Sequence, residues 1–373
     1  MADGRARRGG VPVEEVTAAA YEIPTDQPEG DGTLTWSSTI LVVVRARAGG
    51  AEGIGWTYDG QSAATAVREK LAGVVTGLDV LDVPAANDAM VRACRNLGRP
   101  GIAACAISAV DTALWDLKAR LLDLPLAGLL GRAREDVPIY GSGGFTTYDD
   151  DATRHQVERW VGEWSLPRVK IKIGESWGRR ERRDLDRVAL VRELVGDDVE
   201  VFVDANGAYS RKQAIRMGQA MADDWSVTWF EEPVSSDDLD GLREVRDQCR
   251  ADVAAGEYGY SPQYFVPMLS AVDCVQADVT RCGGVTGWLA VAHLAAAANL
   301  QVSGHCAPNL HASVAVAAAN LRHLEYFHDH VRIEDNLFDG TLSPVGGALC
   351  PDLHRPGHGM AFKEADAEAY RVA

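Results

Sequence analysis

Short apolar runs alternate with longer amphipathic segments through the second half of the chain. The runs start roughly twenty to thirty residues apart, and each precedes a segment long enough for a helix. Their β-branched residues are typical of buried parallel strands. They span residues 137–140, 169–173, 199–203, 227–230, 253–255, 274–277, 300–303 and 324–326. Eight strand–helix units in about 200 residues predict an α/β fold, a (β/α)8-type, TIM-like barrel over residues 137–337. A doubly wound sheet is the alternative, but no G-x-G-x-x-G opens the first unit.

The pattern before residue 137 is different. Residues 38–44 form an apolar run after a polar loop at 24–35, Gly49-Gly50 marks a turn, and residues 53–58 would return as a strand. Apolar residues then recur at helical spacing over 62–77, 84–97 and 102–122. We therefore expect an α+β domain over residues 1–136, completed by a tail at 338–373 that packs back on it.

Composition excludes several classes of function. The chain has 373 residues, 46% of them apolar, and a net charge of −17, which disfavours binding to nucleic acid or to an anionic membrane. No apolar run is long enough to span a membrane. Residues 1–10 are basic but lack an apolar core, so we expect a flexible arm and not a secretory signal. Seven scattered cysteines without a C-x-x-C pair indicate free thiols in the cytoplasm.

The residues that end the apolar runs carry the candidate chemistry, because active sites of such barrels lie where the strands finish. Lys170 and Lys172 alternate along the second run and would point to the same side. If that side is the barrel mouth, each lysine lowers the pKa of the other, and one becomes a candidate proton-abstracting base. The alternative is an edge strand whose lysines face water.

Three carboxylates end the next three runs, at Asp204, Glu231 and Glu257. Oxygen ligands from adjacent strands suit Mg²⁺, which keeps positions open for water or substrate. Each acid taken singly would more often cap the following helix. Of the adjacent pair Glu231 and Glu232, we assign Glu231 as the metal ligand, because strand alternation places it at the same height in the barrel as Asp204. Glu232 would lie outside the ligands and next to them.

A histidine and two further carboxylates end the last three runs. Asp278 and His305 follow adjacent strands, and a carboxylate beside an imidazole fixes its tautomer and raises its basicity. We expect His305 to be a second acid/base, roughly opposite the lysines. Glu325 would lie near the floor of the site, where a protonated carboxyl could donate to a substrate oxygen.

This ordered set resembles the mandelate racemase subgroup of the enolase superfamily. The resemblance covers the K-x-K strand, the D-x-N, E-E-P and G-E endings, and Asp278, His305 and Glu325. It implies that Asp204, Glu231 and Glu257 bind one Mg²⁺ per subunit and that Lys172 is the base on one face. Lys170 would contact the carboxylate of a small-molecule substrate, His305 with Asp278 would serve the other face, and Glu325 would stabilise an enolate. It also implies a homo-oligomer, from dimer to octamer. The muconate-lactonizing subgroup is less similar, because it has a lysine where this chain has Asp278.

Several reactions start from such an enolate. By analogy with the subgroup we favour dehydration of an acid sugar to a 2-keto-3-deoxy sugar acid, with His305 as the acid on the departing hydroxyl. A racemase or epimerase, a cycloisomerase of a sugar lactone, and a binding protein without turnover are the alternatives. The first domain would close the barrel mouth, so we expect substrate contacts from its side chains and from two polar barrel residues. These candidates are Tyr21, Ile23, Trp36 and Trp56, with Asn206 and Arg281 from the barrel.

Overall fold

A three-stranded antiparallel sheet forms the N-terminal part of the structure, a computed structural model in which residues 10–373 are described. Its strands β1 (Glu15–Gly30), β2 (Thr35–Ala48) and β3 (Ala51–Tyr58) pair in that order. The arm expected at residues 1–10 lies, apart from Gly10, outside the described residues. The loop expected at 24–35 is wrong in extent. Its polar stretch is largely strand because β1 continues, through an irregularity after Pro24, to pair with the start of β2.

Helix α4 (Ile102–Leu121) packs on this sheet and buries almost all of its length. The close approach depends on two glycines of β3. A Cβ atom at Gly53 would lie 2.3 Å from the Leu117 nitrogen, and one at Gly55 would lie 2.3 Å from the Ala109 oxygen. The remaining helical turns of this region are α1 (Gln61–Ala66), a π-helical turn (Val67–Leu71), α2 (Ala72–Val75), α3 (Val83–Ala93) and α5 (Leu126–Leu130). All but α5 overlap the ranges that helical spacing predicts, although α3 ends four residues before the predicted 97.

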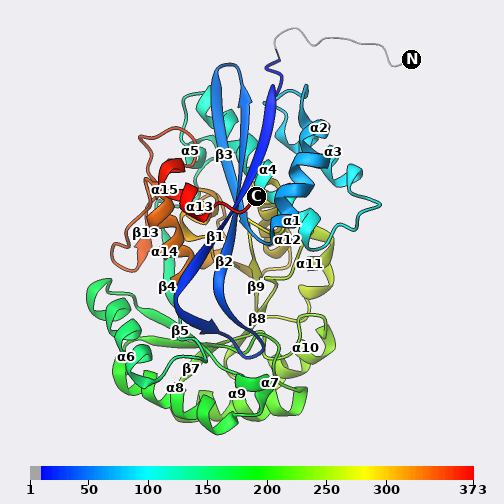
Figure 1. Cartoon of the computed structure of the whole chain (residues 1–373). Coiled ribbons are helices and arrows are strands. Elements are labelled where there is room, and N and C mark those ends of the chain that lie inside the picture. The colour runs from blue at the N-terminus through cyan, green and yellow to red at the C-terminus, as the bar shows by residue number, and fades with distance from the viewer. Residues whose placement is uncertain (1–9) are drawn as a thin grey trace.

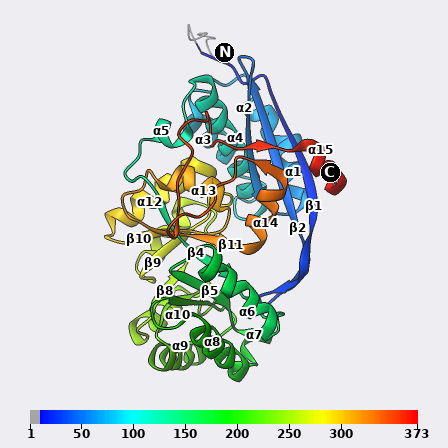
Figure 2. The ribbon, with the colours of Figure 1, turned by 90° about the vertical axis from the view of Figure 1, so that its left-hand side faces the viewer.

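The barrel prediction is confirmed, because eight parallel strands follow and the last pairs with the first. The strands are β4 (Val137–Gly143), β5 (Arg168–Lys172), β6 (Glu200–Asp204), β7 (Val227–Glu231), β8 (Asp252–Ala255), β9 (Cys274–Ala277), β10 (Gln301–Gly304) and β11 (Leu321–Phe327). Every predicted run overlaps one of them. Figure 2 shows the N-terminal strands β1 and β2 reaching down one side of the barrel.

Helices follow the barrel strands and surround them (Figure 1). They are α6 (Asp150–Glu158) with a π-helical turn (Arg159–Glu163), α7 (Glu175–Gly178), α8 (Glu181–Val195), α9 (Arg211–Trp225), α10 (Leu239–Gln248), α11 (Pro262–Met268), α12 (Gly284–Ala297), α13 (Pro308–Ala315) and α14 (His328–Leu337). Inside the barrel, a buried cluster fills part of the lumen with Tyr140, Phe202, Trp229, Ala254 and Cys274. The barrel is therefore packed and not a pore, and this leaves the carboxyl ends of its strands for chemistry.

The C-terminal segment returns to both parts of the molecule. Short strands β12 (Phe338–Asp339) and β14 (Ala361–Phe362) pair with each other, and β13 (Ala348–Leu349) pairs antiparallel with β4. After α15 (Glu364–Ala367) and a 3-10 turn (Glu368–Tyr370), the Val372 N–H donates to the Ala20 carbonyl in β1.

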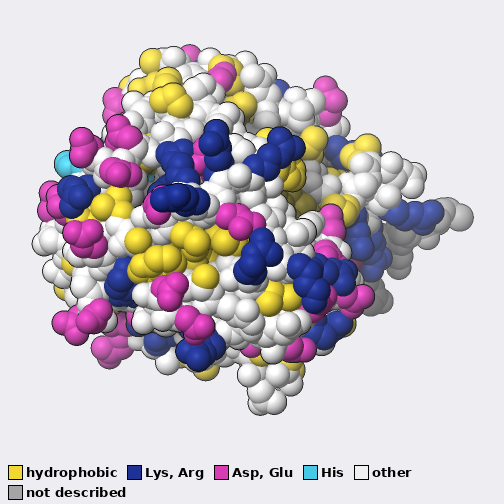
Figure 3. Space-filling model, turned by 90° about the horizontal axis from the view of Figure 1, so that it is seen from below, with side chains coloured by type: hydrophobic (Ala, Val, Ile, Leu, Met, Phe, Trp, Pro, Cys, Tyr) yellow, Lys and Arg dark blue, Asp and Glu magenta, His cyan; other side chains and the backbone are white. Residues whose placement is uncertain are grey.

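The described surface carries both signs of charge. The face seen from below in Figure 3 shows Lys and Arg interspersed with Asp and Glu around a band of apolar side chains. Ion pairs such as Arg216–Glu181 and Lys212–Glu244 join neighbouring helices. Within residues 10–373, none of the helices is long and apolar enough to cross a membrane.

Candidate active site

The ionisable residues that end the barrel strands converge in one buried region. The side chains of Lys170, Lys172, Asp204, Glu231, Glu257, Asp278, His305 and Glu325 are each at most about 5% exposed. A cavity of about 380 Å³ opens beside them, and its lining includes Lys172, Glu257 and His305. The parallel register explains the convergence, because Lys172 pairs with Asp204 and Asp204 with Glu231 across adjacent strands.

Three of these carboxylates form a set that fits a hard divalent cation. One oxygen from each of Asp204, Glu231 and Glu257 lies within 4.8 Å of the others. Glu257 Oε2 is buried and accepts no hydrogen bond, although His305 Nε2 lies 3.3 Å from it, so this oxygen is available as a ligand. An all-oxygen donor set beside an open cavity is what Mg²⁺ prefers. Glu232 is also buried but lies outside this set, and its backbone has a φ of 38°.

Both lysines donate into the carboxylates. Lys172 Nζ lies 2.5 Å from Asp204 Oδ2. Lys170 Nζ contacts Glu231 and lies 2.7 Å from Glu325 Oε1 and 3.5 Å from Asp204 Oδ2. These bonds hold the five side chains in fixed positions at one side of the cavity.

The expected lowering of the Lys172 pKa is wrong for this arrangement. Burial lowers the pKa of Lys172, and Lys170 adds to that, but the negative charges of Asp204, Glu257 and Glu325 together outweigh both and the net pKa is raised. The sequence shows the two lysines side by side without showing that each meets a carboxylate. Lys172 is therefore an ammonium group for as long as the charge of Asp204 is not offset.

His305 is held by Asp278. His305 Nδ1 lies 2.8 Å from Asp278 Oδ2, and since a carboxylate only accepts, Nδ1 is the donor. The pKa of Asp278 is lowered, because the bond to His305 and the charge of Arg281 outweigh burial. Burial lowers the pKa of His305, but Glu257, Glu325 and the bond to Asp278 together raise it above its usual value.

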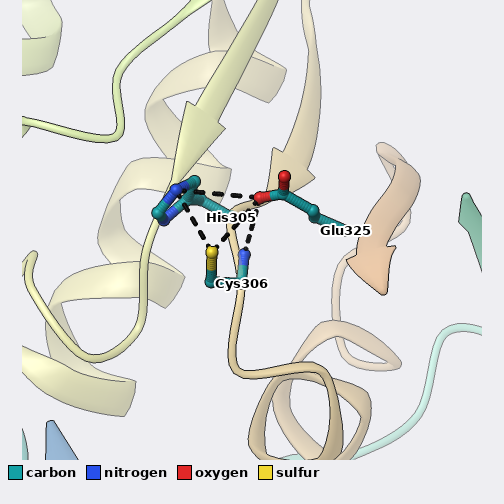
Figure 4. A group of neighbouring side chains, drawn as sticks. All are labelled: His305, Cys306 and Glu325. Atoms are coloured by element: carbon teal, nitrogen blue, oxygen red, sulfur yellow. Dashed lines mark hydrogen bonds and ion pairs between the residues drawn. The ribbon is translucent and has the colours of Figure 1, made fainter. Parts of the chain in front are cut away.

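Glu325 is a charged acceptor in this structure, so the expectation that it is protonated is wrong. Burial raises its pKa, but Lys170, His305 and Lys172 together outweigh burial and hold the pKa well below the usual value. Ser142 Oγ donates to Glu325 Oε1 at 2.6 Å, and the Cys306 backbone N–H donates to Oε2 at 3.0 Å. Figure 4 shows Oε2 directed toward His305 and Cys306.

The candidate substrate contacts divide into two groups. Trp36, Asn206 and Arg281 line the cavity, whereas Tyr21 and Trp56 do not. Tyr21 is buried against Phe362, with ring centroids 5.2 Å apart.

Trp56 and Ile23 are core residues as well. Trp56 packs on Phe338 at 4.6 Å, and its Nε1 donates to Glu334. Ile23 is buried in the same hydrophobic core. The assignment of Tyr21, Trp56 and Ile23 to the pocket is therefore wrong, because the returning C-terminal segment covers this part of the sheet.

The structure adds cavity residues that sequence reasoning missed. They come from β2, from the end of β3 and from the start of α14, and include Ser38, Thr39, Tyr58, Asp59, Asp329 and His330. The sequence signal that could have found two of them is position, because Asp59 directly follows β3 and Asp329 is the second residue after β11. Cys306 was also missed, although it is the next residue after His305.

Comparison with known proteins agrees with this geometry. A family described as "Mandelate racemase / muconate lactonizing enzyme, N-terminal domain" matches residues 15–131, and one described as "Enolase C-terminal domain-like" matches residues 152–366. The chain belongs to the mandelate racemase/muconate lactonizing enzyme family. This family is part of the enolase superfamily, so the resemblance inferred from the strand endings is confirmed.

Members with known structures or curated functions are similar over most of their length. A mandelate racemase/muconate lactonizing enzyme-like protein from Rubrobacter xylanophilus is 48% identical with a TM-score of 0.94, covering 97% of this chain and all of that one. L-Talarate/galactarate dehydratase from Salmonella typhimurium is 32% identical over 83% of this chain and 78% of its own length. Its crystal structure with Mg and L-lyxarohydroxamate has a TM-score of 0.90 at 28% identity and covers 100% of this chain and 96% of that one. The 3,6-anhydro-alpha-L-galactonate cycloisomerase of Streptomyces coelicolor is 31% identical over 94% of this chain and 97% of its own length. The relatives are thus superfamily enzymes of both the lyase and the isomerase classes.

Proposed function

We propose that this protein is an Mg²⁺-dependent acid sugar dehydratase that forms a 2-keto-3-deoxy sugar acid through an enolate. The observation that carries the proposal is that Lys172 and His305, from strand ends on different sides of the barrel, line one cavity beside three carboxylates. An acid/base on each of two sides allows one group to take the α-proton and the other to act on the departing hydroxyl.

Asp204, Glu231 and Glu257 would hold the cation. When bound, it would supply positive charge that stabilises the developing enolate and offsets the Asp204 charge that keeps Lys172 protonated. Lys170, held by Glu231 and Glu325, would place a second positive charge beside the substrate carboxylate.

The two side chains at the cavity would then move the protons. Lys172 Nζ takes the proton from the α-carbon, and the electrons of that C–H bond form the enolate. His305 Nε2 gives its proton to the β-hydroxyl, the C–O bond breaks, and water leaves. The resulting enol takes up a proton at the β-carbon and loses its O–H proton, which gives the 2-keto-3-deoxy acid. Asp278 keeps Nδ1 as the donor, so Nε2 is the atom that exchanges a proton with the substrate.

Epimerisation at the α-carbon is the second candidate, because the same pair of groups favours it. If His305 protonates the α-carbon instead of the hydroxyl, the centre inverts and no water is lost. The cycloisomerase relative keeps a third outcome open for lactone substrates. Assembly as a dimer to octamer and a cytoplasmic location stay predictions, the latter supported by cysteines that are all free among the described residues.

The test is a library of acid sugars incubated with the protein and Mg²⁺, with products assayed as semicarbazones of 2-keto acids. We expect a keto acid from at least one monoacid or diacid sugar. His305→Asn should stop its formation and still allow exchange of the α-proton in D₂O on the Lys172 side. Exchange with inversion and without keto acid in the unaltered protein would assign it to the epimerases instead. Ligand binding without exchange or product would contradict an enzymatic role.

A further inference from the structure

A second group of potential metal ligands lies next to the carboxylate set and shares none of its residues. His305 Nε2 is 3.3 Å from Cys306 Sγ, Cys306 Sγ is 3.4 Å from Glu325 Oε2, and His305 Nε2 is 3.7 Å from Glu325 Oε2 (Figure 4). The three residues are 5%, 3% and 0% exposed. One nitrogen, one sulfur and one oxygen therefore form a nearly equilateral triangle.

The size of this triangle matches one face of a zinc tetrahedron. Zn²⁺ binds nitrogen and oxygen at about 2.0–2.2 Å and sulfur at about 2.3 Å, which places tetrahedral ligands about 3.3–3.6 Å apart. The three measured separations need to change by only a few tenths of an ångström. The donor set is mixed and borderline soft, unlike the all-oxygen set at Asp204, Glu231 and Glu257.

Two of the three ligands, His305 and Glu325, are already oriented by a second partner. His305 Nδ1 donates to Asp278, as in the carboxylate–histidine–zinc arrangement, and this leaves Nε2 facing both the triangle and Glu257 Oε2, which is 3.3 Å away. Glu325 Oε1 accepts from Ser142 and pairs with Lys170, which leaves Oε2 for the triangle.

A cation would have both an entry path and a fourth ligand position. His305 and Cys306 both line the cavity, so water or a substrate oxygen can complete the tetrahedron. The position resembles an open site with three protein ligands and one exchangeable ligand.

We propose that His305, Cys306 and Glu325 form a second metal site that takes Zn²⁺ or a similar borderline-soft divalent cation, and that its occupation inhibits the enzyme. On binding, the S–H bond of Cys306 breaks, a Zn–S bond forms, and the thiol proton leaves to solvent, as does the proton that Nε2 carries when His305 is an imidazolium. The Nε2 lone pair of His305 is then committed to the metal, so His305 no longer transfers protons. The inhibition rests on the proposed function, whereas the metal site itself does not.

Cobalt(II) is the probe, because a bound cobalt thiolate has a charge-transfer absorption in the near ultraviolet. The protein is first saturated with Mg²⁺ and then titrated with Co²⁺. We expect one thiolate-bound cobalt per chain, displaced by Zn²⁺ at equal concentration. Asp204→Asn, which removes a ligand of the oxygen site, should leave this absorption in place.

Cys306→Ser should abolish the absorption, and Cys350→Ser is the matched control. Cys350 is the exposed cysteine among the described residues and is the thiol most open to adventitious binding. If the absorption persists in Cys306→Ser, or disappears in Cys350→Ser, Cys306 is not the thiolate ligand and the proposed site is refuted. Asp278→Asn provides a second measurement if Cys306→Ser folds poorly. It should keep the absorption and weaken cobalt binding about 10–100-fold, and unchanged affinity would argue against His305 as a ligand.

The inhibitory part is tested with any substrate that the protein turns over. Micromolar Zn²⁺ in excess Mg²⁺ should inhibit reversibly, and Cys306→Ser should need at least about tenfold more Zn²⁺ for half inhibition, whatever its own turnover. Equal sensitivity of the two proteins would refute the inhibition. If the protein binds cobalt through the thiolate but turns over no acid sugar, the metal site is supported and the proposed function is refuted.

Discussion

The bond between Asp278 and His305 offers the sharpest test of the proposed proton transfers. Asp278→Asn conserves size and leaves an oxygen to accept from Thr280, whose N–H and hydroxyl both donate to Oδ1 at 2.7 Å. The new amide group would face His305 Nδ1 and donate to it. The imidazole proton would then move to Nε2, and without the Asp278 charge the ring would no longer form the imidazolium that makes Nε2 an effective acid for the departing hydroxyl.

The size of the effect follows from the bond that is lost. A buried hydrogen bond to a charged group contributes about 1.5–3 kcal/mol. If this bond stabilises the transition state for loss of the hydroxyl, its removal lowers kcat by about 10–150-fold. The Lys172 side is not changed by this substitution, so exchange of the α-proton should continue at the original rate.

The assay compares keto acid formation with α-proton exchange, followed by NMR in D₂O on the same substrate. Asp273→Asn is the matched control, because Asp273 precedes the same strand at the opposite end of the barrel and accepts from the Val253 N–H at 2.9 Å. It should leave both rates unchanged. If Asp278→Asn slows exchange and dehydration equally, or slows neither, the idea of two separately acting groups is refuted.

Four further outcomes are expected. Lys172→Ala should lose both α-proton exchange and turnover while calorimetry still detects Mg²⁺ binding, and retained exchange would exclude this lysine as the base. Removal of divalent ions with a chelator should stop turnover, and Mg²⁺ alone should restore it. Burial and the charge of Asp329 raise the pKa of Glu29 from 4.5 to about 9, so the folded protein keeps a proton that the unfolded chain loses across this range. Stability should therefore fall as pH rises from about 4.5 to 9, and Glu29→Gln should flatten that fall in urea unfolding. Gly55→Ala would place a methyl group 2.3 Å from the Ala109 oxygen, so we expect unfolding free energy to drop by about 1–3 kcal/mol or more.

Much of the barrel could be predicted from the sequence because its signals are local. Each strand is a short apolar run, and the residue after it reaches the same end of the barrel as its neighbours. Asp204 and Glu231 therefore meet in the structure as their positions in the chain suggest. The order of strands needed no further information, since consecutive parallel strands joined by helices lie side by side.

The pocket wall and the charge states could not be predicted in this way. Tryptophan is a residue type often found in pockets. Whether Trp56 faces the cavity, however, depends on Phe338 and Glu334, which are nearly 300 residues away. The pKa of Lys172 depends likewise on carboxylates from other strands, which are Asp204, Glu257 and Glu325. The orientation of Trp56 and the pKa of Lys172 both result from contacts between residues far apart in the sequence, and the periodicity of the sequence does not predict such contacts.

The cavity is built from two parts of the chain with different tasks. The groups proposed to move protons end barrel strands, whereas Trp36, Ser38, Thr39, Tyr58 and Asp59 lie in the N-terminal sheet or directly after it. Selection for a new substrate can therefore act on the codons for residues 36–59 without altering the reaction itself. A combinatorial library confined to these five positions would be a compact way to redirect the enzyme, and exchange of this segment between relatives would be a natural route by which one reaction spreads to many sugars.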